Sequence, residues 1–277
     1  MKHINNEVFY KYIKDRIKKN KNFIGVAVGS PGSGKSYGML RIAEKLDKNF
    51  SIDRVAFSSR DFLLLLKEPS IKSGSVIIFD EAGAIGGVNA RTWWDTTNLA
   101  INFVLQTFRY RNIILLITLP DYNFLDSAIR KLATCVFETA GMDQRRGFST
   151  MKAKIQQTNP ITGFSYGKFV RFSHPVTGQI HLVNRLYLKK PSTKMRNAYE
   201  KRKKVFGDNL IDAAIAMTGL KDKKKEDGVA DDKLYNLYKT FMEKNPNANM
   251  TQICLGLRLN RKAVLRLHAR ARDEMKI

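Results

Sequence analysis

Two kinds of hydrophobic pattern alternate along residues 22–140. Continuous apolar runs, as at residues 23–28, 75–79 and 112–118, are typical of strands buried on both faces of a sheet. Between these runs, apolar residues recur at three- and four-residue spacing, as in residues 37–46, which is typical of helices. The alternation predicts an α/β fold with a parallel sheet that carries helices on both faces.

The expected strands of this sheet are residues 23–28, 55–58, 75–79, 112–118 and 134–138. The expected helices are residues 37–46, 60–67, 92–108 and 123–132, with a glycine-containing loop at residues 83–89. A further basic helix is expected at residues 4–18, where Phe9, Ile13 and Ile17 are spaced by four. We expect it to pack on the sheet domain rather than on a membrane, because its apolar stripe is narrow.

The pattern changes after residue 141. Residues 148–157, 167–172 and 180–187 alternate as strands do, and turn-forming residues separate them, which predicts a small antiparallel extension of the sheet. Residues 189–204 then hold eight basic residues and one acidic residue. A short apolar helix is expected at 209–220, and the charged residues 221–232 are expected to be a flexible linker.

Residues 233–277 have the pattern of a separate helical module. Helices are expected at 234–244, 250–255 and 261–275, with a glycine-containing turn before Asn260, which is a good N-cap. Two helices joined by a short turn form a helix-turn-helix pattern. The predicted organisation is thus an N-terminal helix (1–21), a sheet domain (22–140), a β extension with a basic segment (141–220), a linker (221–232) and the module (233–277).

Composition adds a strong positive charge. The chain of 277 residues has 49 Lys and Arg against 25 Asp and Glu, a formal net charge of +24. Such an excess favours nucleic acid as a partner, and an anionic membrane surface second, although a generally lysine-rich composition is an alternative. The two cysteines, Cys135 and Cys254, have no disulfide or metal-ligand spacing. With no signal-peptide pattern and no apolar run long enough to cross a bilayer, we expect a cytoplasmic protein, in the host cytoplasm if it is viral.

The first chemical motif follows the strand at 23–28. Gly29, Gly34, Lys35 and Ser36 match the phosphate loop G-x-x-x-x-G-K-[ST], and the expected strand and helix flank it as that loop requires. Its backbone amides surround phosphate groups, its lysine reaches the β- and γ-phosphates of ATP, and its serine hydroxyl is a ligand of Mg²⁺. The candidate nucleotide-binding residues are Gly29, Ser30, Pro31, Gly32, Ser33, Gly34, Lys35 and Ser36.

Asp80 and Glu81 form the second motif, at the end of the buried run 75–79. An Asp at this place in phosphate-loop ATPases supports Mg²⁺, and the next carboxylate can deprotonate the attacking water. Thr118 ends the neighbouring expected strand and is either a sensor of the γ-phosphate or an ordinary strand-end residue. A GTPase is excluded because no later strand carries a guanine-reading Asn/Thr-Lys-x-Asp motif. A two-lobed helicase is excluded because too little chain follows residue 141.

A cation at the γ-phosphate completes many such sites. Arg109, Arg111 and Arg130 flank the strand at 112–118, and each is a candidate arginine finger for a neighbouring subunit or an ordinary surface residue. We rank Arg130 first and Arg109 second. A finger that acts between subunits predicts a homo-oligomer.

These motifs resemble the additional-strand, catalytic-glutamate division of phosphate-loop NTPases. Within it, the chain is most similar to the FtsK/HerA-type group and its Zot-like relatives. The matching segments are residues 29–36, 76–82, 113–118 and 125–130, together with Arg109. The resemblance implies a sheet of order 5-1-4-3-2 and a multimeric ATPase that moves DNA, in viral packaging, conjugation, chromosome transfer or phage export.

The last expected helix has the two faces of a DNA-reading helix. Lys262, Arg266 and Arg270 form one stripe, with Arg261 before them, while Val264, Leu267 and Ala271 lie on another face. The leading hypothesis is a Mg²⁺-dependent ATPase that acts on virus, plasmid or mobile-element DNA, with possible assembly partners from such an element. The alternatives are an ATP-gated DNA-binding initiator or regulator and a membrane-associated export or assembly ATPase of Zot type.

Overall fold

The computed structural model describes residues 2–82, 96–143, 145–159, 161–173, 178–217, 223–257, 259 and 261–274. The chain forms two compact units, Met1–Asp208 and Asn209–Ile277. The boundary falls within helix α6 (Thr193–Met217), whose first turns belong to the larger unit. This boundary differs from the domain limits at 220 and 233 that the sequence suggested.

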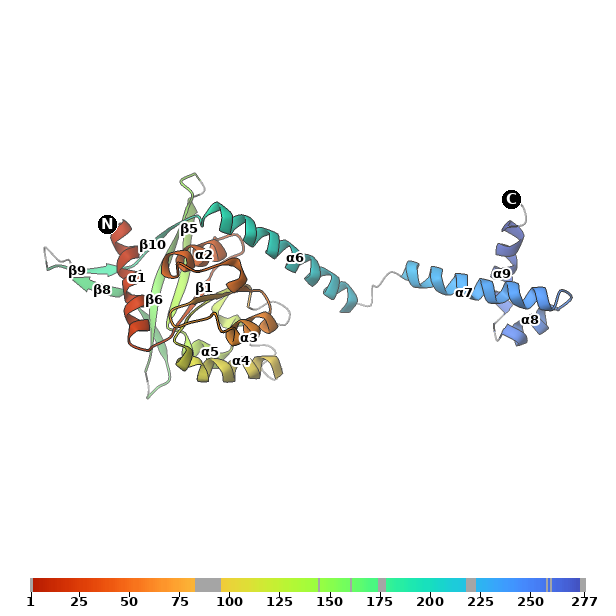
Figure 1. Ribbon diagram of the computed structural model, residues 1–277, viewed down its shortest axis with the longest axis horizontal. Helices are drawn as coiled ribbons and strands as arrows, with labels where there is room; N and C mark the ends of the chain where they lie inside the picture. The colour runs from red at the N-terminus through yellow and green to blue at the C-terminus, as the bar shows by residue number, and fades with distance from the viewer. Residues whose placement is uncertain are drawn as a thin grey trace. The chain divides into compact units, whose positions relative to one another are not determined.

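The larger unit is built on one twisted sheet, and eight strands among the described residues belong to it (Figure 1). Its parallel strands are β1 (Phe23–Val28), β2 (Val55–Ala56), β3 (Val76–Phe79), β4 (Ile114–Leu119) and the first half of β5 (Cys135–Asp143). They run in the order β5-β1-β4-β3-β2. The carboxyl ends of these strands therefore meet at one edge of the sheet, which is where ligands bind in open α/β sheets.

Antiparallel strands extend the sheet beyond β5. β6 (Phe148–Thr158) pairs with β5, with β7 (Ser165–Lys168) and with β10 (Leu186–Lys189), whereas β8 (Val170–Ser173) and β9 (Ile180–Val183) form a separate two-stranded sheet. The single strands predicted at 167–172 and 180–187 are wrong, because each is two strands with different partners. Alternation along a chain shows which residues face inwards but does not show which neighbour a strand pairs with.

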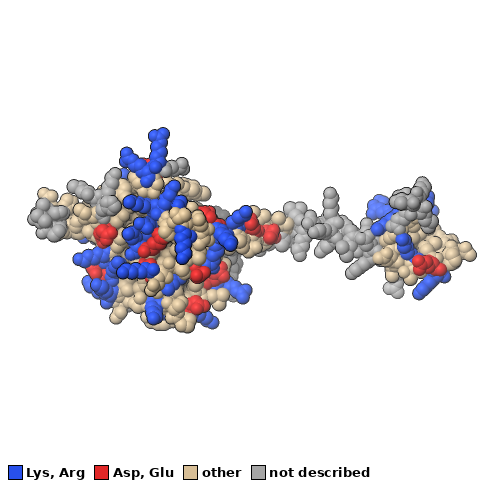
Figure 2. All heavy atoms as spheres, turned by 45° about the horizontal axis from the view of Figure 1, so that its top comes forward, with Lys and Arg blue, Asp and Glu red and all other residues tan. Residues whose placement is uncertain are grey.

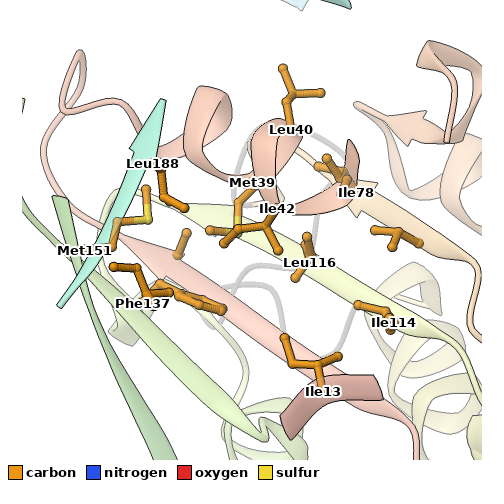
Figure 3. Close-up of a cluster of buried hydrophobic side chains, with 14 of the residues drawn as sticks. Ile13, Met39, Leu40, Ile42, Ile78, Ile114, Leu116, Phe137, Met151 and Leu188 are labelled. Carbon is orange, nitrogen blue, oxygen red and sulfur yellow. The ribbon is translucent and has the colours of Figure 1, made fainter. Parts of the chain in front are cut away.

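Helices cover both faces of the sheet. α1 (Lys2–Lys18), α2 (Lys35–Leu46) and the start of α6 pack on one face, and α3 (Ser59–Lys67), α4 (Thr96–Thr107) and α5 (Ser127–Leu132) pack on the other. Figure 3 shows the hydrophobic core on the first of these faces, where side chains of α1 and α2 meet those of the strands. The predicted packing of the N-terminal helix is confirmed, since Phe9 and Ile13 are fully buried.

Other helix boundaries differ from the sequence prediction. The predicted helix 123–132 is a 3₁₀ turn, η4 (Tyr122–Phe124), followed by α5, because the Asp126 side chain accepts a hydrogen bond from the Ala128 amide and caps a new helix. Two further 3₁₀ turns are η1 (Ile52–Arg54) and η3 (Phe108–Arg111). The expected loop at 83–89 and the start of the helix predicted at 92–108 lie outside the described residues.

The predicted apolar helix 209–220 and linker 221–232 are corrected by the structure. Residues 209–217 continue α6, and α7 (Lys223–Lys244) begins inside the expected linker. High charge alone does not prevent helix formation, because Lys, Glu and Ala are all good helix formers. Residues 218–222 lie outside the described part of the chain.

The smaller unit has its own core. α7, α8 (Met250–Leu257) and α9 (Arg261–Glu274) pack around the buried side chains of Tyr235, Tyr238, Ile253, Val264 and Leu267. The predicted apolar face of the last helix is therefore confirmed at Val264 and Leu267. In neither unit do the described helices combine the length and apolar content that a bilayer span requires.

Removal of the Phe9 side chain tests how much α1 contributes to the larger unit. The Phe9 ring packs edge-on against Phe137, with ring centroids 5.6 Å apart, and is fully buried. Phe9→Ala should lower the free energy of unfolding by about 3–5 kcal/mol, measured by urea denaturation. Lys11→Ala, at an exposed position of the same helix, is the control and should change it little. Equal stabilities of the two variants would contradict this packing role.

Candidate active site

The phosphate loop connects the end of β1 to the start of α2. Gly34 is the N-cap of α2 and has a φ of 87°, in the left-handed region that favours glycine. Gly29 has a φ of 150°, and a Cβ atom there would overlap the hydroxyl of Thr139 on β5. These two glycines are therefore required by backbone conformation and by close packing, respectively, and Gly32 also has a positive φ, of 75°.

Lys35 folds back into this loop. Its Nζ atom donates hydrogen bonds to the carbonyl oxygens of Gly29, at 2.7 Å, and Ser30, at 2.8 Å. Burial lowers the pKa of Lys35, and the nearby carboxylate of Asp80 opposes that shift. The hydroxyl of Ser33 is buried without a hydrogen-bond partner in the described structure. The loop thus holds an ammonium group and an unused hydroxyl where a phosphate would be surrounded by amides.

Asp80 lies at the carboxyl end of β3 and is completely buried. Among the described residues, three hydroxyl groups from three elements donate hydrogen bonds to it. Ser36 Oγ (α2) and Thr118 Oγ1 (β4) lie 2.8 and 2.6 Å from Asp80 Oδ1, and Tyr199 Oη (α6) lies 2.6 Å from Oδ2. A buried carboxylate is tolerated because its oxygens are satisfied in this way.

Glu81 is held by its backbone as well as by its side chain. Its φ is 53°, a left-handed conformation that is uncommon for a residue other than glycine and that concentrates at functional sites. Its amide donates to Thr118 Oγ1 at 2.9 Å, and its Oε1 atom lies 2.7 Å from Lys203 Nζ. The Glu81 side chain is 44% exposed, so solvent can reach it.

Two functional candidates, Tyr199 and Lys203, were missed by sequence reasoning. Burial, and then the charge of Asp80, raises the pKa of the Tyr199 phenol, so it stays protonated and donates its hydrogen bond. Burial opposes but does not outweigh the hydrogen bond to Glu81 and the charge of Asp80, which raise the pKa of Lys203. One signal was present, because Met195 and Tyr199 are i,i+4 apolar positions within the basic segment and both are buried in the core.

These groups open into one cavity of about 840 Å³. The phosphate loop, the ends of β3 and β4, the β5–β6 hairpin and α6 all contribute to its walls. Lys35, Ser36, Glu81, Thr118, Tyr199 and Lys203 all line it. The size is typical of a pocket for a small organic ligand or cofactor.

The residues present fit a magnesium ion. Ser36 lines the cavity, and its Oγ atom lies 2.8 Å from Oδ1 of the buried Asp80 carboxylate, so two hard oxygen donors stand together behind this wall. No group of three or more His, Cys, Asp or Glu side chains with metal-site geometry occurs in the described residues. Mg²⁺ suits such a site, because it keeps several waters and takes substrate phosphate oxygens as its remaining ligands.

The candidate arginines lie elsewhere. Arg130 Nη1 donates to Asn123 Oδ1 at 3.1 Å, and Arg111 Nη2 donates to the carbonyl of Leu66 at 2.6 Å. Neither is among the described residues that line the cavity, and the side chain of Arg109 lies outside the described structure. A finger role for Arg130 or Arg109 stays a prediction.

The four candidate DNA contacts of α9 are all exposed: Arg261, Lys262, Arg266 and Arg270. The guanidinium of Arg270 lies 4.2 Å from the ring centroid of Tyr235, so this side chain also packs within its own unit. DNA contact by these residues stays a prediction.

No known protein family and no curated protein matches the sequence. Solved structures with similar chains include the N-terminal domain of zonular occludens toxin from Neisseria meningitidis, at 22% identity and a TM-score of 0.36, covering 54% of this chain and 95% of that one. RuvB from Thermotoga maritima has 17% identity and a TM-score of 0.34, covering 48% and 44%. The genome packaging NTPase of Sulfolobus turreted icosahedral virus 2, in complex with AMPPCP, has 12% identity and a TM-score of 0.30, covering 53% and 96%.

Similarity at this level carries no information on substrate, so the chemistry of the site follows from its own residues. Lys35 lies in the loop with the phosphate-loop motif, Ser36 and Asp80 form a hydrogen-bonded pair that fits Mg²⁺, and Glu81 follows Asp80 as a carboxylate open to solvent. This set of residues is the one with which P-loop ATPases bind ATP and Mg²⁺.

Replacement of the Thr118 hydroxyl tests the network around Asp80. Thr118→Val removes a donor to Asp80 and leaves the Glu81 amide without its acceptor. We expect a loss of about 1–3 kcal/mol in the free energy of unfolding, measured by chemical denaturation without nucleotide. Thr118→Ser keeps the hydroxyl and should retain most of this stability. A valine variant as stable as the serine variant would show that the hydroxyl is not a structural link.

Proposed function

We propose that this protein is a Mg²⁺-dependent ATPase that works on DNA as an oligomer, in the packaging or transfer of viral, plasmid or mobile-element DNA. The observation that carries the ATPase part is that Lys35, Ser36 and Glu81 line one cavity, with the buried Asp80 carboxylate hydrogen-bonded to Ser36 behind its wall. The DNA part is supported by the charge of the chain and by the two faces of α9.

The chain's own residues divide the work of hydrolysis. Lys35 would bind the β- and γ-phosphates, and Ser36 and Asp80 would hold Mg²⁺, which supplies positive charge to the phosphates when bound. Glu81 would orient a water molecule and take its proton. The water oxygen then bonds to the γ-phosphorus while the bond to the departing ADP oxygen breaks.

Basic side chains give the protein a surface suited to DNA. Figure 2 shows Lys and Arg spread over the visible face of the larger unit, with fewer acidic side chains between them. In the smaller unit, α9 buries Val264 and Leu267 and exposes Lys262 and Arg266. A helix that packs by one face and offers long hydrogen-bond donors on the other is what major-groove recognition requires.

The oligomer part of the proposal depends on Arg130 acting as an arginine finger between subunits. This residue lies on α5, after the strand that carries Thr118, but not among the described residues that line the cavity of its own chain. As an arginine finger, Arg130 would reach the γ-phosphate of a neighbouring subunit. An arginine supplied in this way is worth roughly 10³–10⁵ in rate.

Substitution of Lys35 and of Glu81 should impair the ATPase in different ways. Lys35→Ala removes a phosphate contact and should weaken ATP binding, whereas Glu81→Gln should bind ATP and hydrolyse it about a hundredfold more slowly or worse. Nucleotide binding and phosphate release measure the two effects. Glu68→Gln, at an exposed acid away from the cavity, is the control and should behave as wild type. Near-normal turnover by Glu81→Gln would exclude Glu81 as the base.

A charge-neutralised α9 tests DNA contact in the full-length protein. The double variant Lys262→Gln/Arg266→Gln should bind duplex DNA more weakly, and the slope of log affinity against log salt should fall by about 0.9 for each lost phosphate contact. The matched control is Lys11→Gln/Lys14→Gln, two exposed lysines of α1.

Unchanged affinity and slope in the α9 variant would show that α9 does not contact DNA. Tight binding to one sequence with slow ATP turnover would favour the initiator or regulator hypothesis instead. Binding to anionic liposomes without DNA would favour the export or assembly hypothesis.

A further inference from the structure

Helix α6 brings a cation to the centre of the active site. Lys203 Nζ lies 2.7 Å from Glu81 Oε1 and 3.8 Å from Asp80 Oδ2, and it lines the cavity together with Lys35. The ammonium group also lies 5.6 Å from the centroid of the Tyr199 ring, one helical turn earlier. The basic segment 189–204 therefore contributes to the nucleotide site, which its sequence did not indicate.

The backbone of this part of α6 is firmly held in the larger unit. Tyr199 is 2% exposed and hydrogen-bonded to Asp80. Arg202 Nη1 donates to the carbonyl of Ile52 at 2.7 Å, and the ring of Phe206 stacks on Phe57 with centroids 5.3 Å apart. Contacts on both sides of Lys203 thus fix its Cα position against the core. The approach of its ammonium group to Glu81 therefore follows from the packing of α6.

The ion pair with Lys203 engages the carboxylate of Glu81, the candidate general base. While Glu81 Oε1 is paired with an ammonium group 2.7 Å away, that oxygen is occupied. A bound magnesium ion next to Asp80 would repel the ammonium, and a γ-phosphate in the same cavity would offer it more negative charge than one carboxylate. The lysine side chain can make this change without movement of the helix, because its stem has four flexible carbons and its ammonium group accepts many geometries.

We propose that Lys203 is a further catalytic residue, which contacts the γ-phosphate of ATP in its own subunit and pairs with Glu81 when the γ position is empty. This inference rests on the proposed ATP hydrolysis. It makes Lys203 a sensor of the γ-phosphate, since the same contact that stabilises charge on the transferred group also releases Glu81 to act on water. ADP lacks the γ-phosphate and leaves the ion pair intact.

The test compares the affinity for a non-hydrolysable ATP analogue with that for ADP, both with Mg²⁺, in the full-length protein. A hydrogen bond between charged groups typically contributes enough to change affinity by a factor of about ten or more. Lys203→Met should therefore lower the preference for the ATP analogue over ADP by about tenfold and reduce the hydrolysis rate by about a hundredfold. Lys203→Arg should keep part of the preference for the ATP analogue and part of the hydrolysis rate. Lys204→Met, at the next and exposed position of α6, is the matched control.

The outcomes separate the two levels of proposal. A wild-type protein that binds neither nucleotide would overturn the ATPase itself. Normal nucleotide preference in Lys203→Met would overturn the role of Lys203, and faster hydrolysis by that variant would show that the lysine only restrains Glu81. Loss of preference in Arg130→Ala but not in Lys203→Met would place the sensing cation in a neighbouring subunit. If the methionine variant does not fold, Lys203→Gln gives the same comparison.

Discussion

The buried carboxylate of Asp80 is the constraint on which the active site depends. A charge with no exposure to solvent is costly unless hydrogen bonds replace the water it has lost. Hydroxyl groups from α2, β4 and α6 supply those hydrogen bonds, at 2.6 to 2.8 Å. Any change that moves one of these elements therefore disturbs Asp80, the candidate magnesium-binding side chain. The stability of the core and the geometry of the candidate site are coupled for this reason.

The same network positions the catalytic candidates around Asp80. Thr118 links two of them, because its hydroxyl donates to Asp80 and accepts from the amide of Glu81. Tyr199 fixes the turn of α6 from which Lys203 extends to Glu81. The left-handed backbone of Glu81 lies where β3, β4 and α6 meet. Contacts from these three elements therefore orient its side chain.

Much of the candidate nucleotide site could be predicted from the sequence because its signals are local. The glycines of the phosphate loop, Lys35 and Ser36 act within one strand-loop-helix unit, and Asp80 and Glu81 follow directly from the end of a buried strand. The structure of the β extension and of α6 was harder to predict. Their alternating and charged patterns identified strands and a basic segment, but not the pairing of β8 with β9 or the packing of Tyr199 in the core.

The sequence by itself determined the α/β pattern, the phosphate loop, the Asp80–Glu81 pair and the apolar face of α9, since each depends on residues close together in the chain. Only the tertiary structure decided that the basic segment contributes Tyr199 and Lys203 to the walls of the candidate nucleotide site. Tyr199 lies 119 residues after Asp80, and no pattern within either segment specifies that contact. The physical reason for this long-range contact is that both oxygens of a buried carboxylate need hydrogen-bond donors. Among the described hydroxyl donors, Ser36 and Thr118 bond to Oδ1 of Asp80, and Tyr199 bonds to Oδ2.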